Sequence, residues 1–162
     1  MERVPASASG PMIYQLIYSS SAASLFGQDD LGGILTASRR NNAAADVTGA
    51  LLYASGNFMQ ILEGPNDRVA EVYRRIETDP RHHNATVFLN DPVGERLFPD
   101  CPMAYYHLEG RTKQEHRRNR DLFDPGVPDR QRAGILRRTL ATLAQRDAGT
   151  EPARVYPLRR SA

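Results

Sequence analysis

The sequence predicts an α+β fold in which a single β-sheet carries helices on both faces. Segments that alternate with the two-residue period of strands are interleaved with segments of helical spacing, in the order β-α-β-β-α-β-β. This order is the ferredoxin-like pattern with one added strand, and its two helices can cover only one face of the sheet. Amphipathic segments near the C-terminus are therefore expected to cover the other face.

The first strand and the first helix are expected near the N-terminus. The stretch MIYQLIYSS, which begins at Met12, alternates and is rich in β-branched and aromatic residues. The following stretch, QDDLGGILTASRRNN, places Leu31, Ile34, Leu35 and Ser38 at helical spacing. We therefore expect a strand followed by a helix that ends near the paired asparagines.

A hairpin and a second helix follow. The stretch DVTGALLYASGNFMQILEGP predicts two strands joined by a turn at Ser55–Gly56. The next stretch, NDRVAEVYRRIETDP, has a helical apolar stripe, with Asn66 or Asp67 as the expected cap and Pro80 as the expected end. NATVFLNDPV and PMAYYHLEG supply the last two strands.

Two more helices are expected after the last strand. The stretch TKQEHRRNRDLF predicts a short helix, and RAGILRRTLATLAQRD predicts a longer amphipathic one. The longer segment has Ile135, Leu136, Leu140 and Leu143 on one side. We expect both segments to lie across the open face of the sheet.

Composition indicates an ordinary globular protein: 162 residues, 40% hydrophobic and 25% charged, enough for one domain with a core. The apolar runs are too short to span a membrane, and the N-terminus lacks the apolar stretch of a secretory signal. A single cysteine, Cys101, excludes an internal disulfide and favours a reducing, cytoplasmic setting. We expect a disordered tail over residues 1–10, one domain over 11–109 and a helical extension over 110–162.

Charge is divided unevenly along the chain. Residues 1–109 have a net charge of −5, whereas residues 110–162 have a net charge of +7. A basic extension on an acidic body is typical of proteins that bind nucleic acid or an acidic protein. Because no aromatic residues are interleaved with the arginines, as a single-strand binder would need, a solvated arginine-rich surface is the simpler interpretation. Nucleic acid is therefore not the expected partner.

Gln60 occupies an unusual position for a polar side chain. It lies between Phe58 and Leu62 on one face of its strand. A buried carboxamide costs roughly 1–3 kcal/mol when its hydrogen bonds are not made. Tyr18, on the first strand, can supply a partner, because a buried phenol and a carboxamide satisfy each other. The pair is either a structural hydrogen bond or part of a ligand site.

Two polar motifs flank the expected helices. Asn41 and Asn42 either close the first helix or bind the edge of a planar heterocycle. In DPRHH, Arg81 can bind a phosphate in a bidentate way, and a polar loop is the alternative. A metal site at His82 and His83 is disfavoured, because adjacent residues seldom chelate one ion.

The remaining candidates are Met103 and Cys101. Met103 is expected next to Gln60 as a soft core filler, and Cys101 is expected to be an inert thiol rather than a reactive one. The sequence has no phosphate-binding glycine loop, nucleophile elbow or serine-triad signature. We therefore do not expect an enzyme.

Taken together, these segments resemble a BLUF domain, the blue-light sensor that uses FAD. The matching segments run from about residue 12 to 108 in the family's order and spacing: YQLIYSS, DLGGILTASRRNN, VTGALLYASGNFMQILEGP, VYRRIETDPRHHNATV and RLFPDCPM. The resemblance implies that residues 11–109 bind a flavin between the first two helices. FAD is the expected cofactor, with FMN as the alternative.

The resemblance also implies a role for each matching residue. Tyr18 matches the tyrosine that donates an electron to the excited flavin, and Gln60 matches the glutamine that bridges this tyrosine and the flavin and rearranges after light. Met103 matches the methionine of the switching strand. The other matches are flavin contacts: Asn42 and Asn41 at the pyrimidine edge, Ser38, Ile34 and Ile76 along the ring, and Arg81 and His82 toward the ribityl chain and phosphates.

One position departs from the family pattern. Many members carry tryptophan where this chain has Cys101, and this chain has no tryptophan. The departure bears on the path by which the strand signals and on the lifetime of the lit state.

The expected function is a short blue-light photoreceptor without an enzymatic domain. It would signal through its C-terminal helices to a protein partner and form a homo-oligomer. The alternatives are a ferredoxin-like regulatory module without flavin photochemistry, and nucleic-acid binding through the basic extension.

Overall fold

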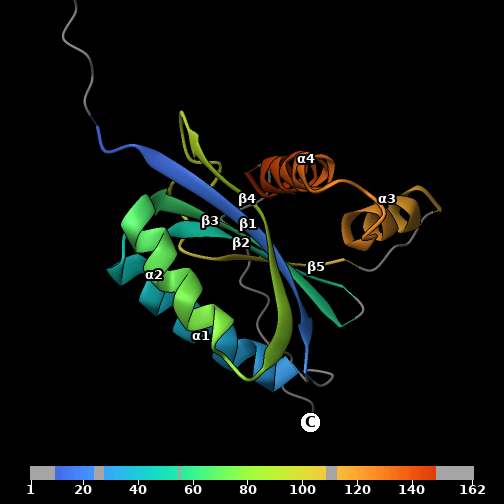
Figure 1. The fold of residues 1–162 in the computed structure, drawn as a ribbon, viewed down its shortest axis with the longest axis horizontal. Coiled ribbons are helices and arrows are strands. Elements are labelled where there is room, and N and C mark those ends of the chain that lie inside the picture. The colour runs from blue at the N-terminus through green and yellow to red at the C-terminus, as the bar shows by residue number, and fades with distance from the viewer. Residues whose placement is uncertain (1–9, 24–27, 55, 109–112, 149–162) are drawn as a thin grey trace, which may run out of the picture.

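The structure is a computed structural model that describes residues 10–23, 28–54, 56–108 and 113–148. One β-sheet separates two pairs of helices, α1 with α2 and α3 with α4 (Figure 1). The elements in chain order are β1 (Ile13–Ala22), α1 (Gln28–Ala44), β2 (Thr48–Ala54), β3 (Asn57–Pro65), α2 (Asn66–Glu77), β4 (His82–Val93), β5 (Ala104–His107), α3 (Lys113–Phe123) and α4 (Asp129–Ala148).

The sheet has five strands in the order β4-β1-β3-β2-β5. Neighbouring strands pair antiparallel except β2 and β5, which are parallel. The predicted ferredoxin-like order with one added strand is confirmed. The expected tail falls largely on residues 1–9, which lie outside the described residues.

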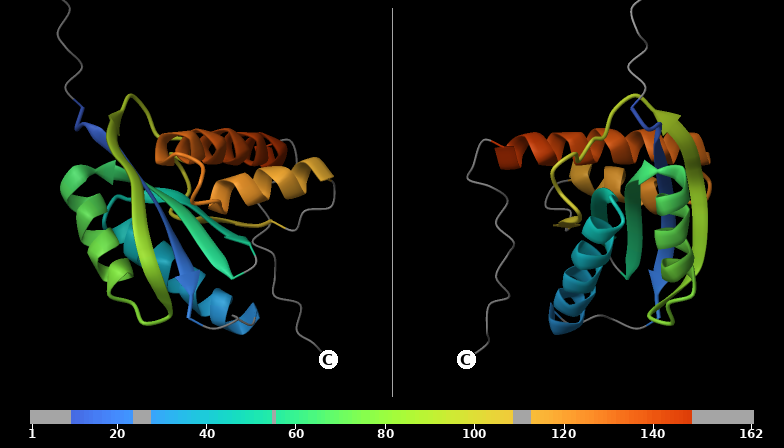
Figure 2. Two further views of the ribbon diagram at one scale, coloured as in Figure 1. Left: turned by 45° about the vertical axis from the view of Figure 1, so that its right-hand side comes forward. Right: turned by 90° about the vertical axis from the view of Figure 1, so that its left-hand side faces the viewer.

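The alternation of strand residues separates two apolar cores. On one face, Leu16 and Leu62 pack with Leu35 of α1 and with Val69 and Val72 of α2. Each fully buried side chain of this kind contributes about 1.5–3 kcal/mol by leaving water. This face is the one covered by α1 and α2 (Figure 2).

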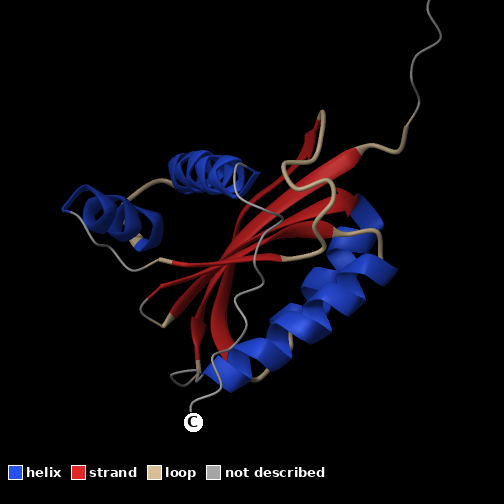
Figure 3. Ribbon diagram, turned by 180° about the vertical axis from the view of Figure 1, so that it is seen from behind, coloured by secondary structure: helices blue, strands red, loops and turns tan. Residues whose placement is uncertain are grey.

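The opposite face is covered by the C-terminal helices. Ile17 and Ile61 of the sheet pack with Leu136 and Leu140 of α4 and with Leu122 of α3. Figure 3, seen from behind, shows α3 and α4 across the sheet from α1 and α2. The expectation that C-terminal helices cover the open face is confirmed.

Glycine is required at two places in the β2–β3 hairpin. Ala54 pairs with Asn57, which leaves a two-residue turn, and Gly56 in that turn has φ of 80°. Ser55, the other expected turn residue, lies outside the described residues. At Gly49, a Cβ atom would lie 1.9 Å from the Ile61 carbonyl oxygen. Only glycine permits this approach of the two strands.

The ends of α2 differ from the sequence expectation. No side chain caps its N-terminus, because β3 leads directly into the helix and Pro65 occupies the cap position. The predicted cap by Asn66 or Asp67 is therefore wrong, although Asp67 lies in the first turn, where the helix dipole favours a carboxylate. The helix ends at Glu77, before Pro80. None of the helices in the described ranges is long and apolar enough to cross a membrane.

Candidate functional site

Tyr18 and Gln60 are direct partners across β1 and β3. The Tyr18 hydroxyl donates a hydrogen bond to Gln60 Oε1, and the two side chains are only 3% and 4% exposed. Both lie on the face covered by α1 and α2, because each alternates with residues of the opposite core. The Tyr18 hydroxyl is therefore the hydrogen-bond partner that the buried carboxamide of Gln60 requires.

The nitrogen of the Gln60 side chain has a softer partner. Nε2 lies 3.4 Å from the sulfur of Met103, which is itself buried just before β5. A thioether is a weak acceptor, so the nitrogen of the carboxamide is held less firmly than its oxygen. The three side chains form a chain from β1 through β3 to the segment that enters β5.

Burial controls the chemistry of the Tyr18 phenol. Burial raises its pKa far above the ordinary tyrosine value, and the charges of Tyr73 and Asp79 raise the pKa further. The Tyr73 ring packs edge-on against Tyr18 with centroids 5.3 Å apart. The phenol therefore stays protonated at neutral pH, and the acceptor it already contacts is the Gln60 oxygen.

A narrow cavity lies beside this pair, between the sheet, α1 and α2. Its apolar walls come from Ile34, Leu51, Phe58 and Ile76. The polar lining residues are Tyr18, Ser20, Ser38, Gln60, Asp79, Arg81 and His82. Apolar walls with a few polar groups are typical of a site for a planar heterocycle.

Asp79, Arg81 and His82 form the mouth of the cavity, where α2 leads into β4. Arg81 Nε donates to Asp79 Oδ1 at 2.9 Å, and this hydrogen bond holds the pKa of Asp79 below its usual value. His82 begins β4 and pairs with Ala22 of β1, so it lies in a strand rather than in the polar loop that the sequence left as an alternative. Its ring nitrogen Nδ1 is buried without a hydrogen-bond partner. An unpartnered polar atom at a cavity is a position for a ligand contact.

Neither of the paired asparagines is among the residues that line this cavity. Asn42 is buried and donates from Nδ2 to the Pro102 carbonyl at 2.9 Å, whereas Asn41 is exposed. Arg39, one turn earlier, donates from Nε to the Met103 carbonyl at 3.0 Å. The C-terminal part of α1 therefore fastens the segment that carries Met103.

Of the predicted site residues, the structure brings Tyr18, Gln60, Ser38, Ile34, Ile76, Arg81 and His82 to the cavity and places Met103 against Gln60. Sequence reasoning missed Ser20, Phe58, Leu51 and Asp79 as lining residues. Alternation indicates two of them, since Ser20 shares a strand face with Tyr18 and Phe58 shares one with Gln60. Arg39 was missed because its partner, Met103, lies 64 residues away in the chain.

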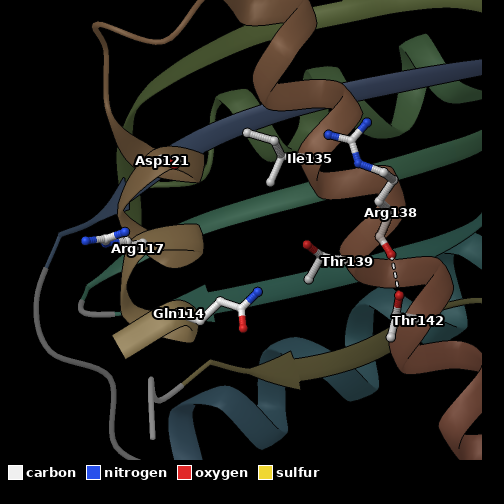
Figure 4. Close-up of a pocket in the computed structure, with 7 residues that line it drawn as sticks. All are labelled: Gln114, Arg117, Asp121, Ile135, Arg138, Thr139 and Thr142. Atoms are coloured by element: carbon white, nitrogen blue, oxygen red, sulfur yellow. Dashed lines mark hydrogen bonds between the residues drawn. The ribbon is translucent and has the colours of Figure 1, made fainter. Parts of the chain in front are cut away.

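A second hollow lies on the other side of the sheet, between α3 and α4 (Figure 4). It has a volume of about 370 Å³ and is lined mainly by polar and charged side chains, among them Arg117, Asp121 and Thr139. Within the described residues there is no group of three or more histidine, cysteine or acidic side chains that could hold a metal ion.

The fold and the cavity define an α+β domain with a partly apolar cavity beside a buried tyrosine–glutamine pair. The chain belongs to the BLUF family, because the family described as sensors of blue-light using FAD matches residues 13–104. Members of this family are blue-light sensors that bind a flavin.

Characterised relatives with similar sequences combine this domain with other regions. The chain is 42% identical over 84 residues to photoactivated adenylate cyclase subunit beta of Euglena gracilis, which covers 52% of this chain and 10% of that protein. It is 35% identical over 116 residues to the blue light- and temperature-regulated antirepressor BluF of Escherichia coli strain K12, covering 72% of this chain and 28% of that protein. The chain thus spans less than a third of the length of either relative.

Solved structures of short BLUF proteins match over most of both chains. The dark-state structure of BlrB superimposes with a TM-score of 0.65 at 30% identity, over 82% of this chain and 98% of that chain. The photo-activated state of BlsA superimposes with a TM-score of 0.69 at 26% identity, over 80% of this chain and 95% of that chain.

Proposed function

We propose that this BLUF protein binds FAD in the cavity between α1 and α2 and switches through Tyr18, Gln60 and Met103. The observation that supports the proposal most strongly is the buried hydrogen-bonded chain of these three side chains beside a cavity with apolar walls. If the hydrogen bond between Tyr18 and Gln60 served only to stabilise the core, it would not require a cavity beside it. The proposal divides the chain into a flavin-binding domain over 11–109 and a helical extension over 110–162.

The lining residues suit the parts of a flavin. Ile34 and Ile76 offer apolar contact to the ring faces, and Ser38 and Gln60 offer hydrogen bonds at its edge. Arg81 and His82, at the mouth, suit the ribityl chain and phosphates, because a guanidinium binds phosphate well. FAD rather than FMN is our proposal, since the family is described by its use of FAD.

Asn42 and Asn41 remain the proposed contacts to the pyrimidine edge. Asn42 gives one N–H group to Pro102, and a carboxamide has a second N–H group and a carbonyl for further bonds. The asparagine would thereby join the ring to the segment that carries Met103.

The switch follows from the two arrangements of a carboxamide. A bound flavin would supply the absorption of blue light and serve as the electron acceptor, and the Tyr18 phenol would be the electron donor. Tyr18 passes its proton to Gln60 Oε1, the acceptor it already contacts. After both the electron and the proton have returned to Tyr18, Gln60 can hold the other arrangement, in which its oxygen faces Met103 instead of its nitrogen. An oxygen is a poor neighbour for a thioether acceptor, so the Met103 segment shifts and the site is bistable.

Output passes through the helices on the far face. We propose that α3 and α4 present the light-dependent surface to a protein partner, with a second copy of this chain as one such partner. The basic extension suits an acidic partner surface rather than nucleic acid. We propose a cytoplasmic sensor whose residues carry no enzymatic activity of their own.

The test is the visible spectrum of protein purified in the dark, before and after blue light. The expected result is a flavin spectrum that shifts slightly to the red in light and relaxes in darkness. Gln60→Leu should keep the flavin and abolish the shift, whereas Gln131→Leu, at an exposed position of α4, should keep the shift. Chromatography of the released cofactor decides between FAD and FMN. A protein that stays colourless after FAD is supplied contradicts the proposal.

A further inference from the structure

Glu63 is a buried carboxylate on the face opposite the cavity. It lies near the end of β3 and is 0% exposed. Its oxygens accept hydrogen bonds from Gln15 Nε2 at 2.9 Å and from the backbone N–H groups of Leu97 and Phe98 at 2.8 and 3.0 Å. A buried carboxylate requires such donors, because removing it from water is costly. Glu63 therefore fixes the start of the segment that leads to Met103.

Gln15 connects this carboxylate to α4. Its nitrogen donates to Glu63, and its oxygen Oε1 accepts a hydrogen bond from Arg137 Nε. A carboxylate only accepts and a guanidinium only donates, so the two partners permit one orientation of the carboxamide. Without Arg137, only the hydrogen bond to Glu63 would fix the orientation of the Gln15 carboxamide.

The segment from Leu97 to Met103 is held from both faces of the sheet. Glu63 binds its first two amide groups on the α4 face. Arg39 and Asn42 bind the carbonyl groups of Met103 and Pro102 on the α1 face. In the middle, the Cys101 carbonyl accepts from Gly49 N at 3.2 Å. This short segment, held at both ends, therefore connects the two faces of the sheet.

We propose that Arg137 of α4 is a positioning residue for the Tyr18–Gln60 site, acting through Gln15 and Glu63 on the segment that carries Met103. This proposal rests on the proposed function and adds to it a route through the sheet between the switch and α4. Coupling between two sites is reciprocal. If α4 restrains the position of Met103, a shift of Met103 in turn weakens the packing of α4. Polarised hydrogen bonds in a buried network are stronger than isolated ones, which suits a relay.

The test compares two neighbouring arginines of α4 in the flavin-loaded, full-length chain. Arg137→Met removes the donor to Gln15, whereas Arg138→Met makes the same chemical change at an exposed position. In the dark, amide hydrogen exchange at Leu97 and Phe98 should become about two- to tenfold faster in Arg137→Met, the effect of one lost hydrogen bond. It should be unchanged in Arg138→Met, and Arg137→Lys, which restores a donor, should recover much of the protection.

A spectroscopic measurement separates positioning from a merely structural role. The relaxation rate of the red-shifted state in darkness should change in Arg137→Met and in Gln15→Leu, and not in Arg138→Met. Unchanged exchange at Leu97 and Phe98 in Arg137→Met, or an equal change in Arg138→Met, overturns the proposal. The exchange measurement is made in the dark and does not depend on a light response. If the unmodified protein shows no red shift, that result counts against the proposed function. The exchange rates at Leu97 and Phe98 still decide whether Arg137 positions the segment.

Discussion

Tyr18 and Gln60 face each other across the β1–β3 ladder, and the phenol donates to the carboxamide oxygen in the core. The register of two strands is thus enough to bring these side chains together, without any loop. Strands hold side chains more rigidly than loops do, which suits a site whose work depends on a hydrogen bond.

Tyr18→Phe tests the role of the Tyr18 hydroxyl as the hydrogen-bond donor to Gln60. The change leaves Gln60 Oε1 buried without its phenol, which should lower the free energy of unfolding by about 1–3 kcal/mol. It should abolish the red shift while the flavin remains bound. Tyr14→Phe, on the same strand and half-buried, is the matched control and should retain the shift. Absorption spectra and chemical unfolding measure both effects, and a normal red shift in Tyr18→Phe would rule out the proposed role.

Met103→Leu and Met103→Ala separate hydrogen bonding from packing. Leucine keeps the volume and removes the sulfur that accepts from Gln60, so the loss in stability should be below about 1.5 kcal/mol. Alanine leaves a cavity and should cost about 2–5 kcal/mol. Both variants should change the amplitude or relaxation of the red shift. If Met103→Leu behaves as the unmodified protein in both measurements, the sulfur has no part in the switch.

Gly49→Ala tests the close approach within the β2–β3 hairpin. A Cβ atom at this position would meet the Ile61 carbonyl oxygen at 1.9 Å, so the strands must separate. We expect a loss of at least about 3 kcal/mol or failure to fold. Gly33→Ala is the control, because nothing lies within 4 Å of its added Cβ atom and the position is an exposed turn of α1. It should gain up to about 1 kcal/mol from helix propensity. Urea unfolding distinguishes the two.

Asp79→Asn tests the ion pair at the mouth of the cavity. Because the hydrogen bond from Arg81 lowers the pKa of Asp79 in the folded state, the pair adds stability above the unfolded pKa, near 3.9. That stability is lost as the pH falls through the folded pKa. The groups are partly exposed, so the loss in Asp79→Asn at pH 7 should be at most about 1 kcal/mol and should vanish at low pH. Unfolding free energies measured from pH 7 down to pH 2 check this, with Asp100→Asn, at an exposed loop position, as the control.

Much of the cavity could be predicted because its residues lie on regular elements. Alternation along β1 and β3 placed Tyr18 and Gln60 on one face, and helical spacing placed Ile34 and Ser38 on one side of α1. The resemblance to the BLUF family added roles that alternation cannot supply, including those of Arg81 and His82.

Other contacts could not be predicted, because they join segments with no local pattern. The segment between β4 and β5 shows neither the alternation of a strand nor the spacing of a helix. Its carbonyl and amide groups nevertheless bind Arg39, Asn42 and Glu63. Arg137 reaches a partner that lies 122 residues away in the chain. Such pairs depend on how helices dock on the sheet, and local propensity contains no information about docking.

The sequence by itself determined the order of strands and helices, the two apolar faces of the sheet, the need to pair Gln60 and the family to which the chain belongs. These follow from the periods of strands and helices and from the cost of burying an unpaired carboxamide. The tertiary structure alone decided that Arg39 and Asn42 on one face of the sheet and Glu63 on the other hold the segment that carries Met103. Packing brings these groups together from opposite sides of the sheet, and no interval along the chain specifies their distances.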